Sequence, residues 1–248
     1  MKEWSYEPAK DHEVPAIERF RSPKREKGLV GTLTHLVTMA LVEGYFRAYN
    51  RLRVVNAKRL PKAAPFVICA NHASHVDALV LASVLPGSAR ETAYAVAAGD
   101  VFFTTVTSSA LASLLVNALP LWRKKVTTHA LEELRTRLLD GHTSLILFPE
   151  GARSRDGGPQ KFKPGIGMIV AGTTIPVYPC YIDGAFEAMP PGKKVPRPKK
   201  ITVTVGEPLR FEDTPNTREG WNAVAAALRK SIGDMAPVPW KPEAVSDA

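Results

Sequence analysis

The first long periodic pattern in the chain lies between residues 28 and 49. Apolar side chains recur there with helical spacing, at Leu29, Leu33, Leu36, Val37, Ala40, Leu41, Tyr45 and Ala48. The stretch without Lys, Arg, Asp or Glu is 15 residues long, whereas a membrane-spanning helix needs about 20 predominantly apolar residues. The pattern therefore predicts an amphipathic helix that lies in, or dips into, a membrane surface. A helix packed on its own domain and a single membrane span are the alternatives.

From residue 65 onward, short apolar runs alternate with segments of helical periodicity. Strands are predicted at residues 66–70, 92–98, 120–123, 144–148, 175–182 and 201–205. Helices are predicted at residues 74–85, within 101–118, and at 130–139 and 219–232. Such alternation indicates an α/β fold. We expect a single domain with a mixed, largely parallel sheet flanked by helices, preceded by the N-terminal amphipathic, membrane-associated helix.

These patterns divide the chain into four segments. Residues 1–27 form a polar, basic arm, and residues 28–60 contain the amphipathic helical segment. Residues 61–233 form the folded domain, and a loose, proline-rich tail follows at residues 234–248. Because the arm has no early apolar run, no secretory signal is expected.

The charge balance adds a preference for anionic partners. The 33 Lys and Arg exceed the 24 Asp and Glu, which gives a formal net charge of +9. Such a surface attracts nucleic acid, anionic lipid or phosphorylated substrates, and charge alone does not choose among them. Basic residues near an anionic leaflet are each worth about 1 kcal/mol. Cations bracket the predicted helix at Arg19, Arg21, Lys24, Arg25, Lys27, Arg47, Arg51, Arg53, Lys58 and Arg59.

The two cysteines point away from redox or metal chemistry. Cys69 and Cys180 each lie within an apolar run. We interpret them as buried small hydrophobes of a reducing compartment. The sequence contains neither a CxxC pair nor a zinc-ligand spacing, so no metal is expected.

A first polar cluster follows directly on a predicted strand. Residues 66–70 lead into Asn71 and His72, and ligands of open α/β sheets bind at the carboxyl ends of strands. His72 and Asp77 lie on different faces of a continuous helix, so they meet only across a turn. Ser74 and Asp77 provide such a turn, as the N-cap and N3 residues of a capping box. The Asp77 carboxylate then reaches the near ring nitrogen of His72 and leaves the other nitrogen free as a general base.

Two other interpretations of this cluster remain open. In the first, Asp77 only caps the helix and His72 is an ordinary loop histidine. In the second, His75 is the functional histidine, although on a helix it would not face Asp77, two residues away.

A second cluster follows the predicted strand at 144–148 and places a glycine and two arginines after a strand end. Arg153 and Arg155 offer planar guanidinium groups that bind phosphate oxygens in bidentate fashion. Lys163 adds charge farther along the same loop. The segment is therefore a candidate anion site, and a solvated basic loop is the alternative. Glu150 is interpreted as an organiser of Arg153.

Together these residues resemble the lysophospholipid acyltransferase family, whose members include 1-acylglycerol-3-phosphate acyltransferases. The first motif of that family, Asn-His-x-x-x-x-Asp, is matched by Asn71, His72 and Asp77. The third, Phe-Pro-Glu-Gly-Thr-Arg-Ser, is matched by Phe148, Pro149, Glu150, Gly151, Arg153 and Ser154.

Other parts of the chain match less closely. Ala152 replaces the threonine of the third motif. Lys163 looks like the lysine of the Phe-Lys-x-Gly stretch that follows, and Pro176 is similar to the proline of the fourth motif. The second motif, in the region of Arg123, is the poorest match. The resemblance covers residues 30–210.

The resemblance implies an acyltransferase domain at residues 61–233 that acts in phospholipid biosynthesis. His72 would be the general base and Asp77 would orient it. The donor would be acyl-CoA or acyl carrier protein, used as a co-substrate without a metal or other cofactor. The acceptor would be a lysophospholipid, with 1-acylglycerol 3-phosphate giving phosphatidic acid as the first choice. Glycerol 3-phosphate and other lysolipids are the alternatives.

The resemblance also assigns residues beyond the pair. Substrate binding is expected from Glu150, Gly151, Arg153, Arg123 and Lys163. A structural role is expected for Asn71, Ser74, Phe148, Pro149 and Pro176. The expected location is the cytoplasmic face of a membrane, as a peripheral or monotopic protein on an anionic surface.

Two rival functions follow from the same residues. A thioesterase or lipase would hydrolyse the acyl group, but the Gly-x-Ser-x-Gly nucleophile elbow is absent from the sequence. A non-catalytic basic membrane-binding protein fits the charge. Nucleic-acid binding is not expected, because no zinc finger, RNP-like aromatic motif or basic zipper is present.

Overall fold

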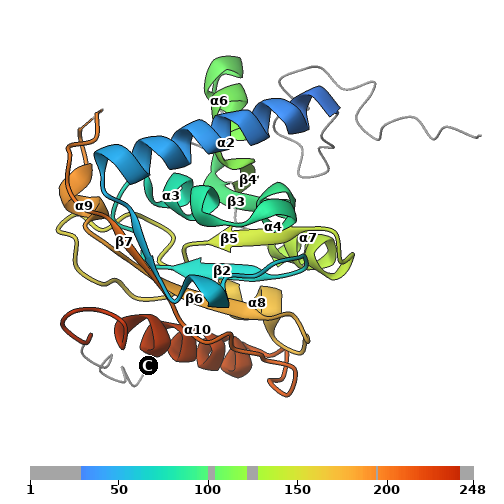
Figure 1. The fold of residues 1–248 in the computed structure, drawn as a ribbon. Helices are drawn as coiled ribbons and strands as arrows, with labels where there is room; N and C mark the ends of the chain where they lie inside the picture. Colours follow the sequence, from blue (N-terminus) through green and yellow to red (C-terminus); the bar gives the residue numbers. More distant parts are fainter. Residues whose placement is uncertain (1–28, 100–103, 122–127, 194, 241–248) are drawn as a thin grey trace, which may run out of the picture.

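The computed structural model describes residues 29–99, 104–121, 128–193 and 195–240. Seven strands of these residues form one sheet in the order β1-β7-β6-β2-β5-β3-β4 (Figure 1). They are β1 (Arg53–Val55), β2 (Val67–Ala70), β3 (Ala93–Ala98), β4 (Leu119–Leu121), β5 (Ser144–Leu147), β6 (Val177–Asp183) and β7 (Thr202–Val205). Neighbouring strands run parallel, except that β6 and β7 run antiparallel. The expected mixed, largely parallel sheet is therefore confirmed.

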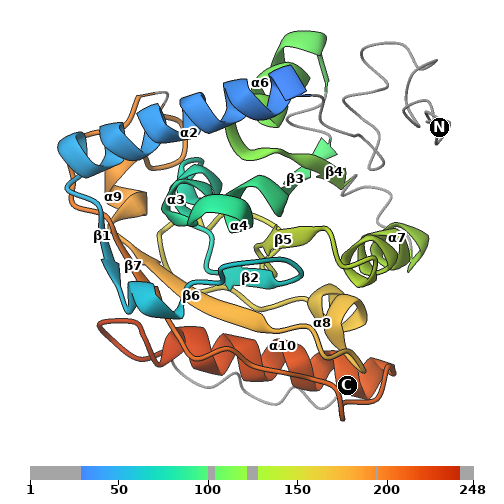
Figure 2. The same cartoon turned by 45° about the vertical axis from the view of Figure 1, so that its right-hand side comes forward.

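Helices cover both faces of this sheet (Figure 2). One face carries α2 (Leu29–Tyr49), α3 (Asp77–Val84), α4 (Gly87–Thr92) and α9 (Ala185–Ala188), with α6 (Val106–Val116) beside α2. The other face carries α7 (Thr128–Leu139), α8 (Gly165–Val170) and α10 (Arg218–Gly233). A short 3₁₀ helix, η1 (Ala57–Arg59), follows β1.

The central strands show why the sheet needs two layers of helices. Every residue of β2 and of β5 is buried. Ile68 and Ala70 face the core under α2 and α3, whereas Val67 and Cys69 face the core over α8 and α10. A strand that is apolar on both sides must be covered on both sides, which is typical of parallel sheets.

All six predicted strands occur within two residues of their predicted bounds, counted over the described residues. The four predicted helices occur as α3, α6, α7 and α10. The strand β1 and the helices α4, α8 and α9 were not predicted, because elements of three to six residues are too short to show a period. In α8 two glycines also lower the helix propensity.

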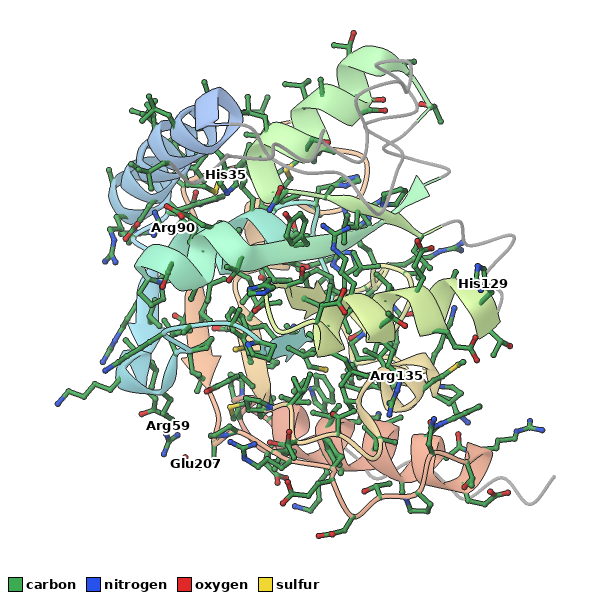
Figure 3. The ribbon with its side chains drawn as sticks, turned by 90° about the vertical axis from the view of Figure 1, so that its right-hand side faces the viewer. His35, Arg59, Arg90, His129, Arg135 and Glu207 are labelled. Atoms are coloured by element: carbon green, nitrogen blue, oxygen red, sulfur yellow. The ribbon has the colours of Figure 1, made fainter. Side chains whose placement is uncertain are left out.

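The predicted N-terminal helix is present as α2, and it packs on its own domain. Met39 and Phe46 are buried against the core that contains α3 and α4. His35 Nδ1 lies 2.7 Å from the carbonyl oxygen of Leu114 in α6. Arg90 of α4 forms an ion pair with Glu43 at 2.7 Å (Figure 3). Polar and apolar contacts thus hold the helix against α3, α4 and α6.

The outward side of α2 is also apolar. Leu33, Val37 and Leu41 are 61%, 54% and 71% exposed. Within the described part of the chain, no helix combines the length and the apolarity that a membrane span requires. The helix is therefore apolar both toward the domain and toward its surroundings.

Part of the predicted tail is packed. Trp240 contacts the rings of Phe162 and Tyr181 edge-on, at 6.2 Å between ring centroids in each case. It also lies against Gly233, where a Cβ would meet it at 3.0 Å, and Ala236 is buried. Trp240 and Ala236, in the segment predicted to be a loose tail, thus pack against the domain. The predicted arm at 1–27 lies outside the described residues.

Candidate active site

The parallel pairing of β2 with β5 brings the two sequence clusters to one edge of the sheet. Cys69 is in register with Leu147, so the carboxyl ends of both strands lie side by side. His72 follows β2 and Phe148 follows β5. Their rings stack, with 4.2 Å between centroids and 21° between planes. Ligands of open α/β sheets bind at this edge.

His72 and Asp77 make the predicted contact. His72 Nδ1 lies 2.9 Å from Asp77 Oδ2. The same carboxylate oxygen accepts the backbone N–H groups of Ala73 and Ser74, each at 2.7 Å. The Asp77 side chain is 1% exposed and that of His72 is 21% exposed. The arrangement fixes the ring through Nδ1 and leaves Nε2 as the nitrogen available to a ligand.

The turn between them differs from the predicted capping box. The helix α3 begins at Asp77, and its N-cap is Val76. The Ser74 hydroxyl donates to the carbonyl oxygen of Met189 at 2.8 Å. The prediction of Ser74 as N-cap is therefore wrong, because the helix begins three residues later and, among the described contacts, the Ser74 hydroxyl accepts only the N–H of Val76, at 3.4 Å, before the helix. The Asp77 half of the box, its bond from the Ser74 N–H, is present.

His75, the competing histidine, is exposed and is not the partner of Asp77 in the described contacts. Burial, and then the positive charges of Arg153 and His72, lower the pKa of His75, while Asp77 opposes them. The ring that lies 2.9 Å from the Asp77 carboxylate is that of His72.

Asn71 joins the site to the neighbouring strand. Its side-chain nitrogen donates to the carbonyl oxygen of Ile182 at 2.9 Å, and its side-chain oxygen accepts the Ile182 N–H at 2.8 Å. This pair of bonds joins the end of β2 to β6.

Gly151 allows the second cluster to fold back on itself. Its φ is +72°, in the region that favours glycine, and a Cβ there would lie 2.7 Å from Nζ of Lys163. Lys163 N–H donates to the carbonyl oxygen of Pro149 at 2.8 Å. The lysine side chain therefore lies over the glycine. Arg153 is half-buried in the same segment.

Glu150 is a buried carboxyl group of the second cluster. It is 4% exposed, and its Oε1 accepts the backbone N–H of His72 at 3.3 Å. Burial raises the pKa of Glu150 to about 8; Asp77 acts in the same direction, whereas the His72 N–H and Arg229 oppose it. The carboxyl faces the histidine main chain rather than the surface.

Sequence reasoning missed two contacts of this segment. The Phe148 ring stacks on His72, and the N–H of Ser154 donates to the carbonyl oxygen of His72 at 2.8 Å. The signal was the co-occurrence of two motifs about 75 residues apart, which indicates contact without naming the atoms.

Two predicted residues lie elsewhere. Pro176 precedes β6, and its carbonyl oxygen accepts the N–H of Val67, at the amino ends of the parallel strands. It is therefore at the edge of the sheet opposite the site. Arg123 lies outside the described residues.

The described part of the chain contains two buried thiols and no clustered set of metal-ligating side chains. No group of three or more His, Cys, Asp or Glu there is placed to hold a metal ion. Cys69 and Cys180 are buried, as predicted, and burial raises the pKa of Cys180 to about 12.

An apolar groove of about 310 Å³ opens beside the pair. Leu41, Val42 and Tyr45 of α2 form one side, and Val76, Leu79 and Pro196 form the other. Val76 directly precedes Asp77, so the groove borders the start of α3, although neither His72 nor Asp77 is among its lining residues.

Fold and site together define an α/β protein with a partly exposed histidine on a buried aspartate, and a basic loop, at the carboxyl edge of its sheet. The family model described as Acyltransferase matches residues 51–183, and the chain belongs to this family.

Individual relatives agree over shorter stretches. The chain is 29% identical to human 1-acyl-sn-glycerol-3-phosphate acyltransferase alpha over 136 residues, which cover 52% of this chain and 44% of that protein. It is 32% identical to the coconut (Cocos nucifera) 1-acyl-sn-glycerol-3-phosphate acyltransferase over 84 residues, or 34% of this chain and 27% of that protein. The chain thus spans less than half the length of these relatives.

A solved structure shares the fold. The 1-acyl-sn-glycerophosphate acyltransferase PlsC of Thermotoga maritima matches with a TM-score of 0.59 and 22% identity, over 82% of each chain. At this identity the likeness concerns the fold alone.

Proposed function

We propose that this protein transfers a fatty acyl chain from a thioester donor, acyl-CoA or acyl carrier protein, to the hydroxyl of a lysophospholipid. The first-choice acceptor is 1-acylglycerol 3-phosphate, which gives phosphatidic acid. The observation that carries the proposal is the 2.9 Å contact between His72 Nδ1 and Asp77 Oδ2 at the carboxyl edge of the sheet. The names of the human and coconut relatives support the choice of acceptor.

The chemistry follows from the two nitrogens of His72. Nε2 takes the proton of the acceptor hydroxyl as its oxygen attacks the thioester carbonyl carbon. When the resulting tetrahedral intermediate collapses, the C–S bond breaks and the imidazolium returns the proton to the leaving thiolate. Asp77 holds the ring through Nδ1 and stabilises its cationic form. The acyl group passes directly between substrates, so no covalent enzyme intermediate is involved.

The basic loop suits the acceptor phosphate. Arg153 supplies a guanidinium group, and Lys163 lies over Gly151 with its ammonium group near the turn. Both positions follow strand β5, on the same edge as His72. We assign the phosphate to this loop, with Arg123 as a further candidate.

The apolar groove suits an acyl chain. It is lined by aliphatic and aromatic side chains of α2 and α3 and ends one residue from Asp77. A chain in this groove would reach the reacting carbonyl or hydroxyl beside His72. Burying it would contribute about 0.8 kcal/mol for each methylene group.

The surface around α2 suits a membrane. Its exposed Leu33, Val37 and Leu41 offer apolar side chains to lipid tails, and exposed Arg47 and Arg51 lie at its carboxyl end. Apolar area together with nearby cations favours an anionic bilayer. We propose peripheral or monotopic association with the cytoplasmic face, which brings the site to its lipid substrates.

One panel assay tests the function. Purified protein is incubated with acyl-CoA or acyl carrier protein and, in turn, with 1-acylglycerol 3-phosphate, glycerol 3-phosphate, a neutral lysolipid, or water alone. We expect phosphatidic acid from the first acceptor and little release of free fatty acid. Faster hydrolysis than transfer would favour a thioesterase, and no turnover with any acceptor would favour a binding protein.

The phosphate site is tested by Arg153→Ala in the same assay. We expect the KM of the phosphorylated acceptor to rise by more than about tenfold, since a charge-assisted hydrogen bond contributes about 1.5–3 kcal/mol. The KM of the donor should change little. An effect confined to the donor would place the phosphate elsewhere.

A further inference from the structure

The two motifs meet at the main chain of His72. Its N–H donates to Oε1 of Glu150 at 3.3 Å, and its carbonyl oxygen accepts the N–H of Ser154 at 2.8 Å. The imidazole stacks on Phe148 at 4.2 Å. One segment, residues 148–154, therefore contacts both backbone polar groups and the ring of the same histidine. This geometry limits where the imidazole can lie before any substrate binds.

Within that segment, Glu150 is the group whose role remains unexplained. Its side chain is buried, with Oε1 turned to His72, while Oε2 has no hydrogen-bond partner among the residues that the structure describes. It borders a cavity of about 10 Å³ that His72, Gly158, Tyr181 and Trp240 also line. A polar cavity of this size is at the lower limit for one water molecule.

The surroundings of Glu150 disfavour its ionised form. Asp77 on α3 is the negative neighbour, and Arg229 on α10 is a positive one. No ion pair joins Glu150 to a cation of the described residues. The other titratable groups near it are His72, Tyr181 and the buried thiol of Cys69. An ionised carboxylate without a paired cation is costly in such surroundings.

We propose that Glu150 is a positioning residue that fixes the main chain of His72 as a neutral carboxylic acid, instead of binding substrate. The role rests on the proposed acyl transfer by His72. The carbonyl oxygen of the acid accepts the His72 N–H, and its hydroxyl donates into the small cavity. A neutral group there holds the histidine without placing a second negative charge beside Asp77.

The kinetic test compares two substitutions of the same residue. Glu150→Gln keeps a neutral side chain with a carbonyl oxygen for the His72 N–H, so kcat should stay within about threefold of wild type. Glu150→Ala removes that acceptor, and kcat should fall by about 10-fold to 100-fold, as expected when a catalytic group shifts by up to 1 Å. Both KM values should stay within about twofold in each variant, because neither substrate contacts the carboxyl.

A matched control removes an exposed carboxyl elsewhere. Glu212 follows Phe211, whose carbonyl oxygen binds the N–H of Gly172, near the amino end of β6 and opposite the site. Glu212→Gln should leave kcat and both KM values unchanged. If Glu150→Gln were as damaging as Glu150→Ala and raised the acceptor KM, a negative charge would be needed and the proposal would be overturned. Full kcat in Glu150→Ala would overturn it as well.

A second measurement does not depend on activity. Infrared difference spectra of wild type minus Glu150→Gln at pH 7 should show the C=O stretch of a protonated carboxyl group, which disappears as the pH passes 8. If the band is missing at pH 7, Glu150 is ionised and the neutral acid is wrong. If the band is present but the wild type transfers no acyl group to any acceptor, the proposed function fails while the protonation state stands.

Discussion

At the scale of single residues, the Asp77 carboxylate organises the site. One of its oxygens accepts three donors, from the His72 ring and from two successive backbone N–H groups. Bonds of this kind between N–H groups and a carboxylate are among the stronger ones in proteins. The turn that brings His72 over the helix start is therefore held by the same oxygen that orients the imidazole.

The two histidines of this turn make a matched pair. We expect His72→Ala to lower kcat by at least 10²-fold to 10⁴-fold, the usual contribution of general-base catalysis, with an unchanged Tm. His75→Ala should stay within about threefold of wild type, since His75 does not pair with Asp77 in the described contacts. Steady-state acyl transfer by both variants decides between them, and the opposite order would make His75 the base.

Glu150 should make stability depend on pH in a defined window. Its folded-state pKa of about 8 lies above the ordinary value of 4.5. Between these values the folded state keeps a proton that the unfolded state has lost, so stability falls as the pH rises through the window. Glu150→Gln removes this loss.

Thermal unfolding at pH 5 and at pH 8 measures the effect. The Tm of Glu150→Gln relative to wild type should be higher at pH 8 than at pH 5, by at least roughly 2–4 °C, the shift that corresponds to 1 kcal/mol in a domain of this size. Glu212→Gln should show no such change between the two conditions. An equal Tm difference at both values would mean that Glu150 is already ionised at pH 5.

At the scale of elements, α2 has two apolar sides with different partners. The inner side packs on α3 and α6, and a buried histidine and an Arg–Glu pair add polar contacts. The outer side is largely exposed over Leu33, Val37 and Leu41. Because α2 is held on the domain by these contacts, its exposed apolar side has a fixed position relative to the active site.

Membrane binding through α2 is testable with charged substitutions outside the groove. Leu33→Asp together with Val37→Asp should weaken co-sedimentation with vesicles of phosphatidylcholine and phosphatidylglycerol by more than about tenfold, since burying one such side chain contributes about 1.5–3 kcal/mol. Turnover of detergent-dispersed substrate should remain. The matched control is Leu139→Asp, on an equally exposed leucine of α7 on the other face of the sheet. Equal loss in the control would exclude α2 as the docking element.

Contact between α8 and α10 depends on one glycine. A Cβ at Gly167 would lie 2.3 Å from Cα of Trp221, so the two helix backbones approach as closely as glycine permits. Arg135 of α7 then binds the carbonyl oxygens of Met168, Ile169 and Ala171 at the end of α8 (Figure 3). This layer lies behind the site, on the face opposite α2.

Two glycine substitutions test that packing. Gly167→Ala should lower the free energy of unfolding by about 1–3 kcal/mol, the usual cost of overpacking. Gly44→Ala on α2 should raise it by about 0.5–1 kcal/mol, because no atom lies within 4 Å of the added Cβ and alanine favours the helix. Urea unfolding of both variants measures whether the free energy of unfolding falls for Gly167→Ala and rises for Gly44→Ala. A neutral Gly167→Ala would mean that α8 and α10 separate at little cost.

At the scale of the whole molecule, the sheet order explains why distant motifs act together. β2 pairs with β5 and β6, so residues 70–77, 148–154 and 182–189 come to one edge. Asn71 bonds to Ile182, Ser74 to Met189 and His72 to Ser154. Three separate chain segments thus share one hydrogen-bond network around His72.

The sequence by itself determined the alternation of strands and helices, because apolar period reports burial locally. It also suggested the His72–Asp77 contact, but spacing alone left a helix cap or His75 as alternatives, and the 2.9 Å distance comes from the structure. Only the tertiary structure decided three contacts. The Ser74 hydroxyl donates to the carbonyl oxygen of Met189, Glu150 accepts the N–H of His72, and Trp240 packs against the core. Each of these depends on a partner far away in the chain, and strand pairing sets such partners in a way that local periodicity does not encode.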